Sequence, residues 1–149
     1  MQLSTRTRYA LRMMVDMSLY QVYGNVKIKD ISKRQDISVK YLEQIITSLS
    51  KAGYVKGERG PQGGYRLGMD AKDITAGMIV RLMEGGTAPA PCIKGEACPR
   101  ASECATTNLW RRISEAVDEI LDSTTIEDLA EDAKRQNIVT ILDSPEYYI

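Results

Sequence analysis

Three cysteines are the residues of this chain best able to do chemistry. Cys92, Cys98 and Cys104 lie at equal steps of six residues, in a segment rich in Gly, Pro and Ala, and the chain has no histidine. Packing does not explain thiols spaced in this way in an irregular loop. Thiolates are soft ligands that suit iron–sulfur clusters. The pattern therefore indicates a site that closes on a metal ion or an iron–sulfur cluster.

Two other uses of these thiols stay open. Zinc accepts three thiolates and a carboxylate, although it has no redox chemistry. A thiol switch without a metal is the second alternative. Three cysteines without a role are the weakest interpretation, because exposed thiols in such a loop oxidise readily. Lys94 and Arg100, which lie between the cysteines, could offset the negative charge of a thiolate-bound cluster.

Length and composition fit a globular protein of one domain with an appended element. The chain has 149 residues, of which 43% are hydrophobic and 27% charged, as in ordinary globular proteins. No apolar run approaches the roughly 18 residues of a membrane span, and no signal-peptide pattern opens the chain. We therefore expect a cytoplasmic protein with no membrane partner. In that reducing compartment an odd number of cysteines favours metal binding or redox sensing over disulfides.

The formal net charge of zero hides a division along the chain. Residues 1–69 carry twelve Lys and Arg against five Asp and Glu, whereas residues 70–149 carry eight against fifteen. A basic N-terminal half is expected of a surface that neutralises phosphates. A solvated helix face is the plain alternative.

Apolar periodicity predicts three helices in the basic half, over residues 3–23, 28–34 and 39–52. Ser38 is a natural N-cap for the third helix, and Gly53 is a natural stop. The second and third helices, joined by a tight turn, form a helix-turn-helix candidate.

A β-hairpin is predicted directly after these helices. Short strands over 54–56 and 65–67 flank the segment 57–64, whose glycines and proline require a turn. A helix-turn-helix followed by such a hairpin is a winged helix. Arg59 lies at the predicted hairpin tip, and arginine is the residue that enters a narrow minor groove.

The acidic half is predicted to contain three further helices. They cover about 74–84, 106–122 and a short acidic helix from a Thr124–Glu127 capping box to near Asn137. The long helix carries one broad apolar stripe, for which we favour a dimer interface over a place in the core. Its members are Leu109, Trp110, Ile113, Val117, Ile120 and Leu121.

The expected fold class is mainly α, a winged helix-turn-helix DNA-binding domain with a long C-terminal dimerisation helix. We expect a DNA-binding domain over 1–84, a cysteine cluster-binding loop over 85–105, and the dimerisation and acidic helices over 106–137. The tail over 138–149, with Pro145, Tyr147 and Tyr148, is expected to be ordered at best in part.

Several segments resemble one family of bacterial regulators. The similar segments are residues 3–10, 30–32, 38–44 (SVKYLEQ) and 59–65 (RGPQGGY), together with the cysteine loop and Leu109-Trp110. Over about residues 1–121 the chain resembles the Rrf2 family, most closely its iron–sulfur-sensing branch, with nitric-oxide-sensing members next. The resemblance implies a homodimeric winged-helix transcription factor with a cluster in the cysteine loop. A 2Fe–2S cluster is expected, with 4Fe–4S as the alternative.

The resemblance also implies which residues contact DNA. It places Ser38, Lys40, Tyr41, Glu43 and Gln44 on the recognition helix. Gln44 has the amide that pairs with adenine, and Glu43 can accept from the amino group of cytosine. The resemblance implies minor-groove contact for Arg59 and phosphate contacts for Lys40, Arg6 and Arg8.

The chain departs from the family pattern at the fourth cluster ligand. Thr107 stands where a histidine would follow the third cysteine, and a cluster in its usual form takes four protein ligands. The open candidates are Glu103, Glu96, Asn108, Thr107 and Asp16 of a partner chain. In the nitric-oxide-sensing pattern an acidic residue of the first helix serves, and the matching position here is Arg8.

The function expected from these features is regulation of transcription, not enzyme catalysis. The chain has no nucleophile–base pair and no phosphate-binding loop, since the glycines at 60–64 lack the Lys-Ser/Thr ending. We expect a regulator that binds operator DNA and uses no small-molecule substrate. It is expected to sense cluster, redox or nitric-oxide status. Its targets would be cluster-biogenesis genes, which it represses or activates. The alternative is a regulator of the same fold that senses thiol redox, zinc or a partner protein without a cluster.

Overall fold

The computed structural model describes residues 2–94 and 98–143, and side-chain surroundings are described as far as residue 136. The described chain is mainly helical, with one β-hairpin. In order, the elements are α1 (Thr5–Tyr20), the 3-10 turn η1 (Gln21–Tyr23), α2 (Ile28–Gln35), α3 (Val39–Lys51), β1 (Val55–Glu58), β2 (Gly64–Leu67), η2 (Ala71–Asp73), α4 (Ala76–Glu84), η3 (Pro91–Ile93), α5 (Thr107–Ser123) and α6 (Ile126–Asp143).

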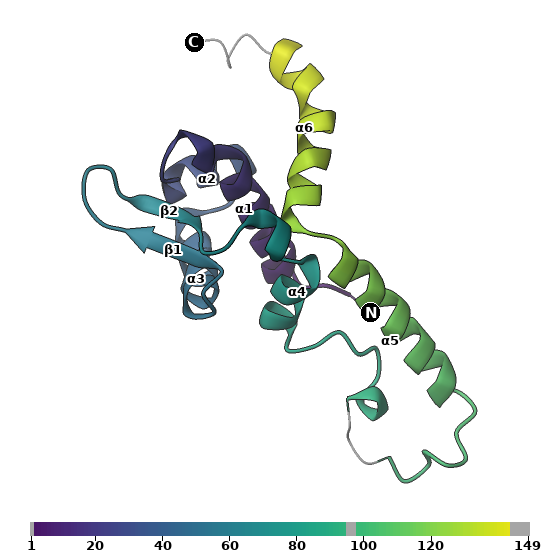
Figure 1. Ribbon diagram of the computed structural model, residues 1–149. Helices are drawn as coiled ribbons and strands as arrows, with labels where there is room; N and C mark the ends of the chain where they lie inside the picture. Colours follow the sequence, from purple (N-terminus) through teal and green to yellow (C-terminus); the bar gives the residue numbers. More distant parts are fainter. Residues whose placement is uncertain (1, 95–97, 144–149) are drawn as a thin grey trace.

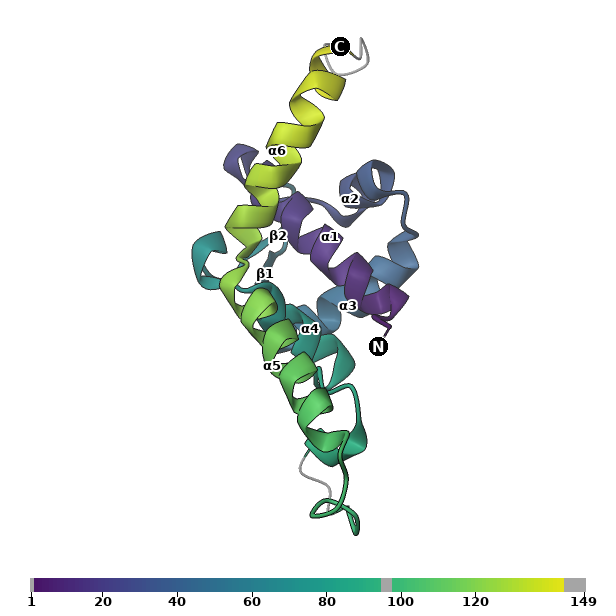
Figure 2. The ribbon, with the colours of Figure 1, turned by 90° about the vertical axis from the view of Figure 1, so that its right-hand side faces the viewer.

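These elements form a body and a rod. Helices α1 to α4 and the hairpin make the body, while α5 and α6 follow each other along one side of it (Figures 1 and 2). The segment between α4 and α5, which carries the cysteines, extends away from the body at the far end of α5 (Figure 1). The fold is a winged helix-turn-helix, as the sequence predicts.

Helix α1 lies at the centre of the hydrophobic core. Its three methionines Met13, Met14 and Met17 are completely buried, one helical turn apart or adjacent. Methionine suits this place because its flexible side chain fills irregular gaps. The other helices supply the residues packed around them, which include Ile31, Leu42, Ile45, Leu49, Ile79 and Ile126. The apolar face of α3 is thus packed against α1.

Local capping signals define both ends of α3, as predicted from the sequence. The Ser38 hydroxyl accepts from the backbone N–H of Tyr41 at 3.2 Å, which satisfies one free donor of the first turn. Gly53 follows the helix with a φ of +83°, a conformation that few other residues adopt without strain. Asp36 takes a left-handed conformation in the turn between α2 and α3, with a φ of 54°.

The hairpin pairs in antiparallel register from Val55 opposite Leu67 to Glu58 opposite Gly64. Each strand has four residues, one more than predicted. Val26 forms an additional antiparallel bridge with Tyr65, so the chain after η1 acts as a short third strand. The hairpin is therefore attached to the body along β2.

The C-terminal end differs from the prediction. The capping residues of α6 are Thr125 and Asp128, which exchange side-chain and backbone hydrogen bonds at 2.9 and 3.0 Å, and not Thr124 and Glu127. Thr124 instead donates its hydroxyl proton to the carbonyl of Ile120. The prediction was wrong by one residue because both threonines have an acidic residue three positions later.

Helix α6 is also longer than predicted, since it continues past residue 137 to Asp143. No glycine or proline interrupts residues 126–143, and the buried side chains of Ile126 and Ala130 anchor the helix to the body. Residues 138–143 are therefore helical and not part of a tail. The predicted features Pro145, Tyr147 and Tyr148 lie outside the described residues. None of the described helices is long and apolar enough to span a membrane.

Candidate nucleic-acid interface and cysteine loop

The outer face of α3 presents the polar residues that the sequence assigns to base reading. Lys40, Glu43 and Gln44 are exposed, while Leu42 and Ile45 on the opposite face are buried. An exposed polar helix face of this kind is the part of a helix-turn-helix that enters the major groove. The amide of Gln44 and the carboxylate of Glu43 are free to meet base edges.

Ser38 and Tyr41 have structural contacts as well. Ser38 is the N-cap of α3, and the half-buried Tyr41 packs edge-on against Tyr9 of α1, with ring centroids 5.7 Å apart at 87°. The guanidinium of Arg12 lies 5.3 Å from the centre of the Tyr9 ring. Tyr41 thus fixes the orientation of α3 on α1 and leaves only part of its ring for DNA.

The first basic residues of α1 lie beside the recognition helix. Arg6 donates from Nη2 to the hydroxyl of Ser48 on α3 at 2.6 Å. Arg8, also exposed, donates to the hydroxyl of Thr5 at 3.0 Å. Contact with Ser48 places the Arg6 guanidinium next to α3, where flanking phosphates are expected.

An ion pair between the buried Asp16 and the partly exposed Arg34, which the sequence pattern did not reveal, joins α1 to α2. Arg34 donates to both carboxylate oxygens of Asp16, at 2.9 and 2.7 Å, and Gln35 donates to Asp16 at 3.1 Å. The hydrogen bond to Asp16 raises the pKa of Arg34 above its ordinary value, against the effect of burial. Arg34 also stacks over Tyr20, 3.8 Å from the ring centre.

This pair removes one candidate ligand. The Asp16 carboxylate is completely buried and bound to Arg34 and Gln35 within its own chain. To reach a cluster in a partner chain it would have to leave the core and give up its hydrogen bonds to Arg34 and Gln35. The suggestion that Asp16 is the fourth cluster ligand is therefore wrong.

The three cysteines lie in the segment between α4 and α5. Cys92 is half-buried in η3, Cys98 and Cys104 are exposed, and all three are free thiols. Across the described ranges, no three His, Cys, Asp or Glu side chains gather closely enough to hold a metal ion. The three thiols are soft ligands of the kind that an iron–sulfur cluster requires. The described conformation does not bring them together.

Cys104 has an environment that favours its thiolate. Its sulfur lies 3.1 Å from the hydroxyl of Thr106, directly before α5. Hydrogen bonds from the side chains of Thr106 and Thr107 lower the pKa of Cys104 to about 7. Thr107, the residue at the histidine position of the family pattern, thus already contacts the thiol. Glu103 and Asn108 are exposed oxygen donors nearby, and Glu96 lies outside the described residues.

A charged clamp holds α5 against α4. Arg81 of α4 donates to both carboxylate oxygens of Asp122 at 2.6 and 2.9 Å, and to Asp118 at 3.0 Å. These hydrogen bonds raise the pKa of Arg81, with Asp122 the largest cause, and Arg81 lowers the pKa of Asp122. Thr87, at the start of the cysteine segment, donates to the same oxygen of Asp118 at 2.5 Å. The clamp therefore joins the body, the rod and the cysteine segment.

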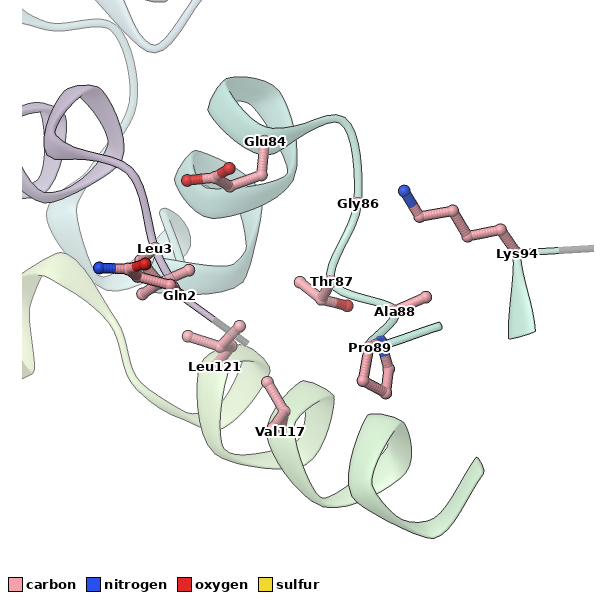
Figure 3. A pocket seen from close by; sticks show the side chains of 10 residues that line it. All are labelled: Gln2, Leu3, Glu84, Gly86, Thr87, Ala88, Pro89, Lys94, Val117 and Leu121. Atoms are coloured by element: carbon pink, nitrogen blue, oxygen red, sulfur yellow. The ribbon is translucent and has the colours of Figure 1, made fainter. Parts of the chain in front are cut away.

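A cavity of about 240 Å³ lies where these parts meet, lined by residues that include Leu3, Glu84, Thr87, Pro89, Val117 and Leu121 (Figure 3). Glu84, at the end of α4, accepts from the hydroxyl of Thr7 at 2.5 Å and from the backbone N–H of Ser4 at 2.8 Å. The hydrogen bond from Thr7 is the main reason why the pKa of Glu84 lies below its usual value. The start of α1 is thus tied to the end of α4 beside the cysteine segment.

The predicted dimer stripe of α5 divides between two environments. Val117 and Leu121 line the cavity and face the body. Leu109 is 46% exposed and Ile120 is 66% exposed. An open groove on the outer side of the helix is lined by Ile113 and Ala116. Trp110 is half-buried. An outward apolar strip over Leu109, Ile113, Ala116 and Ile120 remains without cover in the single chain.

The arrangement defines the class of this protein, a winged-helix DNA-binding protein. Comparison with known sequences agrees, because the family model described as "Rrf2: Iron-dependent Transcriptional regulator" matches residues 3–132. The HTH-type transcriptional regulator IscR of Aliivibrio salmonicida is 37% identical over 97% of this chain and 89% of its own length.

Solved structures give the same result. The structure of CymR, the global cysteine regulator of B. subtilis, is 41% identical and superposes with a TM-score of 0.78 over 88% of this chain and 97% of that one. IscR of T. potens is 34% identical, with a TM-score of 0.76 over 91% and 90%. The chain belongs to the Rrf2 family of transcriptional regulators. Its relatives are regulators and not enzymes, in agreement with the expectation from sequence.

Proposed function

We propose that this protein is a homodimeric transcriptional regulator of the cytoplasm that binds operator DNA and responds to iron–sulfur, redox or nitric-oxide status. Cys92, Cys98 and Cys104 would hold an iron–sulfur cluster, with an oxygen donor such as Glu103, Thr107 or Asn108 as the fourth ligand. The target genes would include those of cluster biogenesis. A cluster supplies a centre whose presence depends on iron supply and oxidants.

The observation that carries this proposal is the connection of the cysteine segment to both halves of the molecule. The segment begins at the end of α4, which packs on α1, and ends at Cys104, directly before α5. Thr87 binds Asp118, which also binds Arg81. A change in the order of this segment therefore acts on the contact between body and rod.

In this proposal, different residues contact the bases, the phosphates and the minor groove of the DNA. Gln44 and Glu43 read base edges, Lys40 and Arg6 hold phosphates, and Arg59 reaches the minor groove. In a dimer, the outward strip of α5 would set the distance between two such heads. Two half-sites on DNA lie about 34 Å apart, one turn of the double helix. A small rotation of α5 against α4 therefore changes how well the two heads fit both half-sites at once. Couplings of roughly 1–3 kcal/mol, or about 5- to 150-fold in affinity, are typical of such switches.

The test begins with anaerobic purification. We expect a coloured protein with bound iron and sulfide, and expect the Cys92→Ala, Cys98→Ala, Cys104→Ala triple variant to be colourless but still folded and dimeric. A triple variant that keeps the absorbance would contradict the ligand assignment. Operator affinity of the coloured and the metal-free protein, measured at one salt concentration, then shows whether the segment controls DNA binding.

A second candidate is a regulator of the same fold that works without a cluster, through thiol redox, zinc or a partner protein. The similarity to CymR, described as a global cysteine regulator, favours it. So does the exposure of Cys98 and Cys104 as free thiols. A colourless protein from anaerobic cells, with operator affinity that changes on oxidation of its thiols, would support this candidate over the first.

A further inference from the structure

The hairpin that carries Arg59 is attached to the body by the chain segment after α1. The side-chain oxygen of Gln21 accepts from the backbone N–H of Leu67 at 2.9 Å. Val26 exchanges two backbone hydrogen bonds with Tyr65, at 2.8 and 2.7 Å. Since a two-stranded hairpin alone is marginally stable, its direction depends on such attachments.

Asn25 is the attachment nearest to the tip of the hairpin. Its side-chain amide donates to the carboxylate of Glu58 at 2.8 Å and to the backbone carbonyl of Gln62 at 3.0 Å. Glu58 is the last residue of β1 and directly precedes Arg59, while Gln62 lies on the return side of the turn. Asn25 therefore uses both of its amide hydrogens to join the two sides of the loop that bears Arg59.

The packing around Asn25 leaves the loop little freedom. Gly64 has a φ of +149°, and a Cβ at this position would lie 2.7 Å from the carbonyl oxygen of Val26 and 3.2 Å from the Cβ of Asn25. A Cβ on Gly63 would lie 2.6 Å from the carbonyl oxygen of Glu58. Glycine is required at both positions because the backbones approach so closely. Gly64 thus serves the contact with Asn25, while Gly63 serves the close approach of the two sides of the turn.

Asn25 also affects the charge beside Arg59. The carboxylate of Glu58 accepts from Asn25 and is directed toward the body. If this hydrogen bond is lost, the carboxylate is free to pair with the neighbouring guanidinium and to reduce its attraction for phosphates.

We infer that Asn25 is a positioning residue for the wing, one that orients Arg59 toward DNA and holds Glu58 away from it. This role rests on the DNA-binding part of the proposed function. It extends that function to a residue outside the recognition helix and the wing motif. Its contacts join positions 33 and 37 residues apart in the chain.

The test is a double-mutant cycle of DNA affinity. Full-length wild type, Asn25→Ala, Arg59→Ala and the double variant are titrated with a duplex selected by the wild-type protein from a random library, at one salt concentration. We expect Asn25→Ala to weaken binding about fivefold in the wild-type background and hardly at all when Arg59 is already alanine, since coupled residues are non-additive. Glu58→Gln, which keeps an oxygen to accept from Asn25, is expected to bind at least as tightly as wild type.

Thermal unfolding of each variant is measured first, and Asn25→Ser replaces Asn25→Ala in the cycle if the alanine variant does not fold. An equal loss of affinity with and without Arg59, or no loss at all, would overturn the role of Asn25 while the DNA-binding function stands. Failure of the wild-type protein to select any duplex would instead remove the proposed function.

Discussion

Cys104 differs from the other two thiols in its surroundings. It lies just before the first turn of α5 and contacts the hydroxyls of Thr106 and Thr107. The thiolate is the form that binds metals and reacts with electrophiles, so a lowered pKa makes this cysteine ready for either role near neutral pH. The spacing of the cysteines in the sequence predicts where the thiols lie but not this difference, which depends on a hydroxyl contact at the helix start.

The reactivity of Cys104 is therefore expected to follow pH with a midpoint of about 7. In metal-free, reduced protein with Cys92→Ser and Cys98→Ser, the rate of alkylation by iodoacetamide should rise as the pH passes this value and then level off. Thr106→Val removes the largest cause of the lowered pKa and should move the midpoint toward the ordinary thiol range. Equal midpoints in the two proteins would show that Thr106 does not stabilise the thiolate.

The helices and strands follow local sequence signals wherever these signals are decisive. The cap at Ser38, the stop at Gly53 and the hairpin around Gly60–Gly64 were predicted because each depends on residues close in sequence. The end of α6 and its cap at Thr125 were predicted wrongly, because two equivalent caps compete and because no glycine or proline marks where the helix ends before Asp143. Contacts between distant segments, such as those of Asn25 and Asp16, leave no periodic pattern and could not be predicted.

The ion pair of the buried Asp16 with Arg34 is expected to stabilise the contact between α1 and α2. Asp16→Asn should lower the free energy of unfolding by about 2 kcal/mol, somewhat less than for a fully buried pair because Arg34 is partly exposed. Asp132→Asn, which removes the exposed partner of Arg135 on α6, is the matched control and should change it by less than about 0.5 kcal/mol. Urea unfolding of both variants checks this. Equal effects would mean that burial of Asp16 adds nothing.

At the scale of the whole molecule, the outward strip of α5 is an apolar surface that the single chain leaves uncovered among the described side chains. A single winged-helix head makes few contacts with DNA, and two heads joined by a two-fold axis match the symmetry of paired half-sites. The strip combines Leu109, Ile113, Ala116 and Ile120 at helical spacing, as an interface between two copies of α5 requires.

Ile120→Asp is expected to convert the proposed dimer into a monomer, because it places a charge within the apolar contact. Val22→Asp is the matched control, because Val22 belongs to η1 and not to α5. It is 75% exposed, and Ile120 is 66% exposed. Light scattering after size exclusion gives the mass of each variant. A dimer that survives Ile120→Asp would exclude this face of α5 as the interface.

The opposite charges of residues 1–69 and 70–149 give the molecule a permanent electrical polarity. A duplex within reach of this field attracts the basic residues 1–69 and repels the acidic residues 70–149, so the protein turns before it touches the phosphates. Encounters then begin in the orientation that binding needs, which speeds association. The advantage fades as dissolved ions screen the field beyond about 8 Å at physiological ionic strength.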